Sequence, residues 1–465
     1  MNHQWMFGCR VARRRSTLGL VCTALVVVTV GVRAQQSLSL DEAVAIALQR
    51  NTTLTISAAK ADAALAKASE QSAALLPSIK CSAGYQRLSE VDPFHVTVPF
   101  LPQPIVLAPV VLNNYTSRLW FQHPLFTGSR LQNSARAADN LARAAQFDYS
   151  RDRAEVALAV TAAYWMLYQA TAAKRFIDEN VVRLQAMESD TRNLLKAGFA
   201  TRNDLLNVQV QLNAALLLQV DARNDVQLEM MQLNMLIGNE SQTTLTLTSR
   251  PSPPAMEPEG KPYRQEEEER NTRVLIARAF EARPDLLAAQ SRIEAARATG
   301  RAAEGGWLPQ VIVNGGLTYA RPNPRYQPTR DEFKTTWDIG VQLQFDVWNG
   351  GATNHQIAQA RAALAQAEAM YEQLKDYIAL DVRRQQLAVK RAEEKVRVAA
   401  LGIEQAEEHQ RTMNDKYKQG MATSTELLDA NVALLQAATN HNTALVEYEL
   451  AQAKLRRAIG ALNLP

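Results

Sequence analysis

The chain has 465 residues, of which 47% are hydrophobic and 21% are charged, and its formal net charge is +4. Five of the 51 basic residues and none of the 47 acidic residues lie in the first 34 positions, so the rest carries 46 basic against 47 acidic side chains, a net charge of −1. This balance excludes the electrostatic footprint of a nucleic-acid-binding protein.

Residues 1–34 are predicted to be a signal peptide. Basic residues from Arg10 to Arg15 precede an apolar run from Leu18 to Val32, and Val32-Arg33-Ala34 predicts a cleavage site. A transmembrane anchor is disfavoured, because about 15 apolar residues span only about 22 Å as a helix, against about 30 Å of bilayer core. A lipid anchor at Cys22 stays open as a weaker alternative. Cleavage would leave Cys81 as the single cysteine, which excludes an intrachain disulfide.

The remaining sequence consists of two copies of one unit. Residues 47–77 align with residues 279–309 at an offset of 232, and later segments align at an offset of 222. The second offset relates Lys196-Ala197-Gly198 to Lys418-Gln419-Gly420. We predict a first repeat at 35–240, a linker at 241–272 and a second repeat at 273–465. Prolines and the acidic run Glu266–Glu269 give residues 241–272 a composition that cannot continue a helix and that indicates a linker, which can contain short local structure.

Each repeat is predicted to contain a helix, a strand pair, a long helix and a shorter helix. The first helix, at about 40–76, is rich in alanine and ends before Pro77. The long helices, at about 129–197 and 352–419, would each span about 100 Å. They end at Gly198 and Gly420. The shorter helices end at Gly238 and Gly460, and Thr423–Glu426 resembles a capping box at the start of the second.

Four segments, at about 79–87, 115–124, 311–320 and 335–347, are predicted strands. Apolar and polar residues alternate along them, most strictly from Thr336 to Val347, whereas Trp120 interrupts the polar side of the second segment. A half-buried soluble sheet shows the same alternation. No other segment has the character of a globular cap for the apolar face, and no run of 18 apolar residues supplies a membrane-spanning helix, so we favour strands that cross a membrane.

Four strands cannot close a barrel, and lipid does not tolerate an unpaired strand edge. Oligomerisation is therefore required. Two chains would supply eight strands, whose side chains fill the interior, whereas three would supply twelve strands around a lumen. The residues alone do not distinguish three chains from four.

The duplicated unit and its glycine turns, each followed by a Leu-Leu pair, resemble the TolC family of outer-membrane efflux proteins over essentially the whole mature chain. The family pattern appears as Tyr417, Gly420, Glu426 and Asp429, with Gly198, Asp204 and Asn207 in the first copy. The resemblance implies a mainly α fold with a β-barrel part. It would be a homotrimer whose 12-stranded transmembrane barrel continues into a long periplasmic α-helical barrel, in the bacterial outer membrane.

The resemblance also implies a periplasmic gate at the glycine turns, formed by Asp204, Asn207, Tyr417, Glu426 and Asp429. Glu426 and Asp429 share a helix face, so three chains would form carboxylate rings that disfavour anions and raise their own pKa values. Asp204 and Tyr417 match the inter-helix polar links of the family, but Ala422 replaces an arginine found in some members. Alternatively, these acids merely occupy a solvated first helical turn, where the helix dipole favours them.

The two turns themselves are candidate docking tips for the helical hairpin of a periplasmic adaptor, or simply tight turns. They comprise Gly198, Phe199, Ala200 and Thr201, and Gly420, Met421, Ala422 and Thr423.

The leading interpretation is a passive exit duct of a tripartite efflux or type I secretion system, supplied by an inner-membrane transporter through the adaptor. The alternative is a soluble periplasmic coiled-coil scaffold or adaptor. An enzyme is disfavoured, because the histidines lack metal-ligand spacing and no phosphate loop or nucleophile motif occurs. We therefore expect no catalytic residue, no metal and no cofactor.

Overall fold

The structure is a computed structural model that describes residues 36–96, 99–100, 105–108, 110–254 and 265–461. The predicted signal peptide, residues 1–34, lies outside the described residues. In chain order the elements are β1 (Gln36–Leu38), α1 (Leu40–Arg50), α2 (Thr52–Ala73), β2 (Ser78–Arg87), β3 (Phe94–Val96), β4 (Ile105–Ala108), β5 (Asn113–Phe126), α3 (Arg130–Lys196), α4 (Arg202–Ile237), β6 (Leu245–Leu247), α5 (Gln265–Ala282), α6 (Pro284–Glu304), the 3₁₀ turn η1 (Gly305–Trp307), β7 (Gln310–Arg321), β8 (Lys334–Gln344), α7 (Ala352–Lys418) and α8 (Ser424–Ala458).

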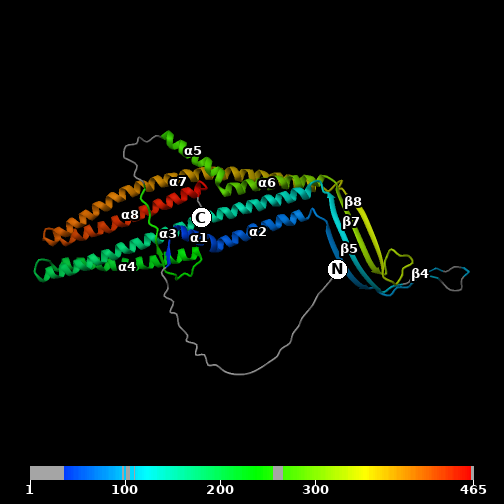
Figure 1. Cartoon of the computed structure of the whole chain (residues 1–465), viewed down its shortest axis with the longest axis horizontal. Coiled ribbons are helices and arrows are strands. Elements are labelled where there is room, and N and C mark those ends of the chain that lie inside the picture. The colour runs from blue at the N-terminus through cyan, green and yellow to red at the C-terminus, as the bar shows by residue number, and fades with distance from the viewer. Residues whose placement is uncertain (1–35, 97–98, 101–104, 109, 255–264, 462–465) are drawn as a thin grey trace, which may run out of the picture.

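The helices lie along one another as a long rod, and the main sheet extends from one end of it (Figure 1). The long helices α3 and α7 have 67 residues each and set the length of the rod at about 100 Å. α3 packs against α2 and α4, and α7 packs against α6 and α8. The shorter helices thus follow one another along the long ones, with the glycine turns at the end far from the sheet (Figure 1).

The structure corrects the first predicted helix, at about 40–76, which is broken into α1 and α2 at Asn51. The Asn51 side chain caps α2 by accepting a hydrogen bond from the Thr53 amide at 2.9 Å, and it donates to the Leu236 carbonyl at 2.8 Å. The acidic run Glu266–Glu269, in the predicted linker at 241–272, lies in α5.

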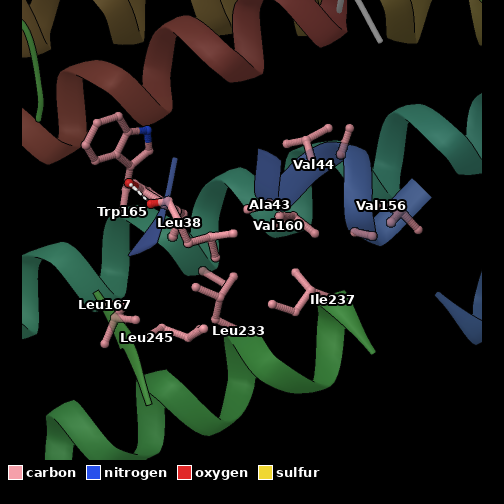
Figure 2. Close-up of a cluster of buried hydrophobic side chains, with 14 of the residues drawn as sticks. Leu38, Ala43, Val44, Val156, Val160, Trp165, Leu167, Leu233, Ile237 and Leu245 are labelled. Carbon is pink, nitrogen blue, oxygen red and sulfur yellow. Dashed lines mark hydrogen bonds between the residues drawn. The ribbon is translucent and has the colours of Figure 1, made fainter. Parts of the chain in front are cut away.

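The main apolar core lies near the middle of the rod, where β1, α1, α3, α4 and β6 meet (Figure 2). Val160 of α3, Leu233 and Ile237 of α4, and Leu38 of β1 are fully or almost fully buried there. The Tyr164 hydroxyl donates to the Leu38 carbonyl at 3.1 Å and accepts from the Ser249 amide at 2.9 Å. Tyr164 thereby ties the short parallel pair of β1 and β6 to α3.

One stretch of α3 is long and apolar enough, by length and composition, to cross a membrane, so the sequence-based exclusion of such a segment was too strong. Almost half of that stretch, 44%, is buried inside the chain. Val160, Tyr164 and Leu167 of α3 belong to the central core, and packing against other helices accounts for their apolar character.

The main sheet is antiparallel, with the order β2-β5-β7-β8. β8 ends at Gln344, three residues before the end predicted for the fourth strand. All four strands connect to helices at the same end, while the loops at the other end include the small β3-β4 hairpin (Figure 1). β2 and β8 are the two edges of the described sheet.

Candidate functional site

The two glycine turns at the far end of the rod have the same geometry. Gly198 and Gly420 have φ angles of +79° and +73°, a left-handed conformation that disfavours any residue with a Cβ. In the first turn the Phe199 amide donates to the Leu194 carbonyl at 2.9 Å, and in the second the Met421 amide donates to the Lys416 carbonyl at 2.8 Å. Each is the hydrogen bond of a Schellman motif, which ends the long helix and turns the chain.

A capping box starts the helix that follows each turn. The Thr201 amide donates to the Asp204 carboxylate at 2.9 Å, and the Thr423 amide donates to the Glu426 carboxylate at 2.7 Å. The hydroxyl of each threonine in turn accepts from the backbone amide of the acidic residue. The sequence indicated the second box and missed the first, because Asp replaces the usual Glu or Gln at the third helical position.

Near the glycine turns, hydrogen bonds of Ser424 and of Tyr417 connect the helical pair of the first copy with that of the second. The Ser424 hydroxyl donates to the Asp204 carboxylate at 3.0 Å. The hydroxyls of Thr191 and Tyr417 lie 2.8 Å apart and are hydrogen-bonded. Asp204 and Tyr417 were expected to form inter-helix links, whereas their partners Thr191 and Ser424 were not identified from the sequence.

An apolar cluster lies behind these links. Met187 and Leu184 of α3, Val208 of α4, and Leu427 and Leu428 of α8 are buried together. The Leu-Leu pair that follows the second turn is therefore a packing element that holds α8 against the first copy. The other two expected gate residues, Asn207 and Asp429, are exposed.

The carboxylates at the turns are stabilised in their ionised form within one chain. Backbone and side-chain hydrogen bonds from Thr423 lower the pKa of Glu426, which is fully exposed. The Thr201 hydroxyl, the Thr201 amide and the Ser424 hydroxyl lower the pKa of Asp204. Capping therefore acts against the rise in pKa expected from a ring of carboxylates, and the repulsion in such a ring would have to exceed it.

The apolar face of the main sheet is uncovered in the single chain. Cys81, Leu119, Leu317 and Trp337 are paired in register across the four strands, so they lie on one face. Trp337, Ile339, Val341 and Leu343 on the edge strand β8 are each close to 70% exposed. So large an apolar surface marks contact with lipid or with another protein.

Polar side chains occupy the opposite face of the sheet. Arg118 and Asp338 form an ion pair at 3.6 Å on this face. Trp120, which interrupts the polar pattern of the sequence, is paired in register with Lys80, whose ammonium lies 5.9 Å from the ring centroid. A cation–π contact thus accommodates the aromatic ring among charged neighbours.

Among the residues that the structure describes, no group of three or more His, Cys, Asp or Glu side chains is arranged to hold a metal ion.

Comparison with known proteins agrees with this geometry. The family model described as outer membrane efflux protein matches residues 43–239 and 275–461. The outer membrane protein TolC of Vibrio cholerae is 24% identical over 407 residues, which cover 87% of each chain. The outer membrane efflux protein BepC of Brucella suis is 23% identical over 349 residues, 73% of this chain and 72% of that protein.

A solved structure shows the same fold at greater sequence distance. The Campylobacter jejuni CmeC outer membrane channel has a TM-score of 0.74 and 16% identity, and the match covers 91% of this chain and 86% of that chain. The matched family and these relatives are outer-membrane channels and not enzymes, and they lie in the outer membrane and extend into the periplasm. The chain belongs to the outer membrane efflux protein family.

Proposed function

We propose that three copies of this chain form the outer-membrane duct of a tripartite efflux or type I secretion system. The observation that carries the proposal is the main sheet, which has two edge strands and an uncovered apolar face. In lipid every backbone group must be paired, so such edges must be closed by other chains. A soluble scaffold, the alternative interpretation, would leave the same apolar face in water.

The strand order allows the sheets of three chains to close into one barrel. Four antiparallel strands alternate in direction, so β8 of one chain runs antiparallel to β2 of the next. Three sheets then give twelve antiparallel strands around a lumen, with the polar face that carries Arg118 and Asp338 turned inward. The helical rods would continue this wall into the periplasm as a tunnel.

The far end of the rod is the proposed gate of this duct. The links from Asp204 to Ser424 and from Tyr417 to Thr191 hold the two helical pairs of one chain together. A neutral hydrogen bond such as that between Tyr417 and Thr191 typically contributes about 0.5–1.5 kcal/mol, and one to a charged group such as the Asp204 carboxylate about 1.5–3 kcal/mol. Links of this strength can hold an aperture in one arrangement and still be broken by a partner.

The glycine turns project beyond these links and are the proposed docking tips for a periplasmic adaptor. Phe199 and Met421 are 84% and 67% exposed at the two tips. The residues on which the contact would depend are Gly198 to Thr201 and Gly420 to Thr423. An inner-membrane transporter would supply the substrate and the energy, while this chain supplies the path.

Cation block in planar-bilayer conductance tests the gate. We expect Glu426→Ala with Asp429→Ala to weaken block by multivalent cations, because two carboxylate rings are lost. The matched control is Asp41→Ala with Glu42→Ala, which removes an acidic pair and its capping box at the start of α1, away from the tips. If block is unchanged in the Glu426 and Asp429 variant, these residues do not line the pore mouth.

A further inference from the structure

The two outer helices of the rod each lack a neighbour on one side. In the half of the rod that ends at the glycine turns, the helices lie in the order α4-α3-α8-α7, because α3 packs against both α4 and α8, and α7 packs against α8 (Figure 1). The outer sides of α4 and α7 are therefore uncovered in the single chain.

These outer helices carry apolar side chains that are exposed. On α4 they are between 43% and 70% exposed and lie at Leu206, Val210, Leu217, Val220, Leu228, Met231 and Met235. On α7 they are between 52% and 67% exposed and lie at Tyr377, Leu380, Leu387, Val398 and Leu401. Most of the intervals are three, four or seven residues, the spacing of a helix that packs along another helix. Such surfaces mark contact with another protein.

The duplication identifies what covers them. The helices α3 and α7 have 67 residues each and begin at Arg130 and Ala352, so the offset of 222 relates them from end to end. The same offset relates α4, which begins at Arg202, to α8, which begins at Ser424. Within one chain, α3 of the first copy meets α8 of the second copy. The equivalent contact, of α7 with α4, is absent from the contacts of the single chain and can form only with another chain.

A groove between α7 and α8 has the composition and position expected of the receiving side. Its lining includes Ala399, Gly402, Ala437 and Asn440. At the offset of 222 these residues correspond to Ile177, Asn180, Ala215 and Leu218. All four of the latter lie where α8 covers the groove between α3 and α4, through Leu428, Asn431 and Leu435. The counterpart of α8 is α4, so the groove between α7 and α8 fits α4 of a neighbouring chain.

One hydrogen bond between α3 and α8 predicts an ion pair between chains. Gln169 donates to the Thr443 hydroxyl at 3.1 Å. At the offset of 222 this pair corresponds to Arg391 of α7 and Asp221 of α4. Both are exposed, and neither makes an ion pair with any residue that the structure describes. Two opposite charges without partners thus stand where the first junction has a hydrogen bond.

The other side-chain contact between α3 and α8 predicts an apolar pair between chains. Arg457 donates to the Glu155 carboxylate at 2.9 Å. Glu155 and Arg457 correspond to Tyr377 of α7 and Met235 of α4. These two are 52% and 70% exposed, and a thioether packs favourably against an aromatic ring. Both contacts therefore give complementary side chains at the same offset.

We propose that the groove between α7 and α8 binds α4 of a neighbouring copy of this chain, in the register that pairs Arg391 with Asp221 and Tyr377 with Met235. The inference rests on the proposed duct, in which β8 of one chain meets β2 of the next and so brings the second copy of one chain beside the first copy of another. An exposed ion pair contributes little stability, so Arg391 and Asp221 set the register while the apolar side chains supply the contact.

Disulfide cross-linking in native outer membranes tests this register. In a protein without native cysteines, Arg391→Cys with Asp221→Cys should form a covalent trimer on denaturing gels after oxidation. Tyr377→Cys with Met235→Cys should do the same. The two cysteines of one chain lie on opposite outer helices, so each disulfide must join two chains.

The matched control combines Arg391→Cys with Leu228→Cys, seven residues further along α4. Seven residues span about 10 Å of helix, beyond the reach of a disulfide, so the control should stay monomeric on the gel. Cross-linking of the control in place of the Asp221 pair, or monomers from both proposed pairs, would overturn the register. Cross-links between β8 and Cys81 report on the barrel alone, so their presence in that case would leave the proposed duct intact, and their absence would overturn it as well.

Exchange of the two charges tests the ion pair itself. Arg391→Asp and Asp221→Arg each place like charges opposite each other, and each should lower the temperature at which the purified trimer dissociates in detergent. The double variant restores opposite charges and should recover that temperature. Losses that simply add in the double variant would show that the two side chains do not meet.

Discussion

The helices of the two repeats break at equivalent positions, and a different side chain makes the hydrogen bonds at each break. Asn51 separates α1 from α2, and Arg283 separates α5 from α6. Both have extended backbone, with φ and ψ of −66° and 126° at Asn51 and −74° and 122° at Arg283. Both side chains donate to the last turn of a shorter helix, Asn51 to the Leu236 carbonyl and Arg283 to the Ala458 carbonyl. We call these sites the first hinge and the second hinge.

The first hinge is neutral. The amide of Asn51 replaces the missing helical hydrogen bonds on both sides, since its oxygen caps α2 and its nitrogen reaches α4. No proline is needed, because the side chain itself favours the non-helical conformation of an N-cap.

The second hinge is ionic and buried. Pro284 keeps Arg283 out of the helical conformation, and the Arg283 guanidinium forms two hydrogen bonds to Asp285, at 3.0 and 2.7 Å. It also pairs with Asp381 of α7 at 3.1 Å. Arg457 of α8 extends the network from Asp381 to Glu155 of α3. The second hinge therefore joins four helices through charges, whereas the first joins two through an amide.

The comparison shows that both repeats need the break between the helices, whereas the side chains that stabilise it can be either neutral or charged. The neutral amide of Asn51 needs no charged partner. A buried arginine needs carboxylate partners, so removal of the arginine alone should cost much more unfolding free energy than replacement of the arginine together with its carboxylates.

The largest effect is expected from Arg283→Ala. Asp285 would stay buried without its ion-pair partner, and Asp381 would keep only Arg457. Breaking a buried ion pair in this way typically costs about 3–5 kcal/mol. Thermal and denaturant unfolding of the purified protein, followed by helical circular dichroism, measures this loss. A cost below about 1 kcal/mol would show that water reaches the second hinge and that the ion pairs contribute little.

A smaller loss is expected from Asn51→Ala. The variant removes the cap of α2 and the donor to the Leu236 carbonyl, together worth about 1–2 kcal/mol. The same unfolding experiment compares it with Arg283→Ala. Equal losses in the two variants would contradict the distinction between a neutral and an ionic hinge.

Exchange of the second hinge for the residues of the first should cost less than Arg283→Ala. Arg283→Asn, Asp285→Thr and Asp381→Ala give the second copy the residues found at Asn51, Thr53 and Ala159. The triple variant leaves neither Asp285 nor Asp381 as an unpaired buried carboxylate, so we expect only the smaller cost of the buried volume that is lost, about 1–2 kcal/mol. A triple variant as unstable as Arg283→Ala would show that the charges themselves are needed.

The smallest effect concerns pH. Burial disfavours the Asp285 carboxylate, yet its hydrogen bond and charge interaction with Arg283 outweigh this and hold its pKa below 3.8. A lowered pKa stabilises the fold above the unfolded value and loses that effect as pH falls. We expect little change in the unfolding free energy between about pH 7 and pH 5, and a decrease below about pH 4 that is smaller in the triple variant. If the unfolding free energy fell equally in the native protein and in the triple variant, carboxylates other than Asp285 would be responsible for the decrease.

Much of the fold follows from local sequence. The long helices end where Gly198 and Gly420 permit a left-handed residue, and strict alternation identifies the strand that carries Trp337 to Leu343. These signals depend only on neighbouring residues. The break at Asn51 was missed because its partner, Leu236, lies 185 positions away. At the second hinge, Pro284 was an available local signal.

The candidate site was less accessible from sequence for the same reason. Asp204 and Tyr417 were recognised through their place in a family pattern, but their partners Ser424 and Thr191 are 220 and 226 positions away. Serine and threonine on a helix are usually solvated or bonded to the backbone, so nothing local marks these two.

The central claim is that the edges of each sheet are closed by neighbouring subunits, and intersubunit cross-linking tests it most directly. Cys81 lies on edge strand β2, on the apolar face, and edge strand β8 presents Trp337, Ile339, Val341 and Leu343 on the same face. In a protein without Cys9 and Cys22, cysteines placed singly along β8 should form disulfides with Cys81 of another chain at one or two of these positions. The product would be a covalent trimer on denaturing gels, with little cross-linking from Asp338 or Gln342 on the opposite face. Monomers alone at every position, from protein in native outer membranes, would contradict the account.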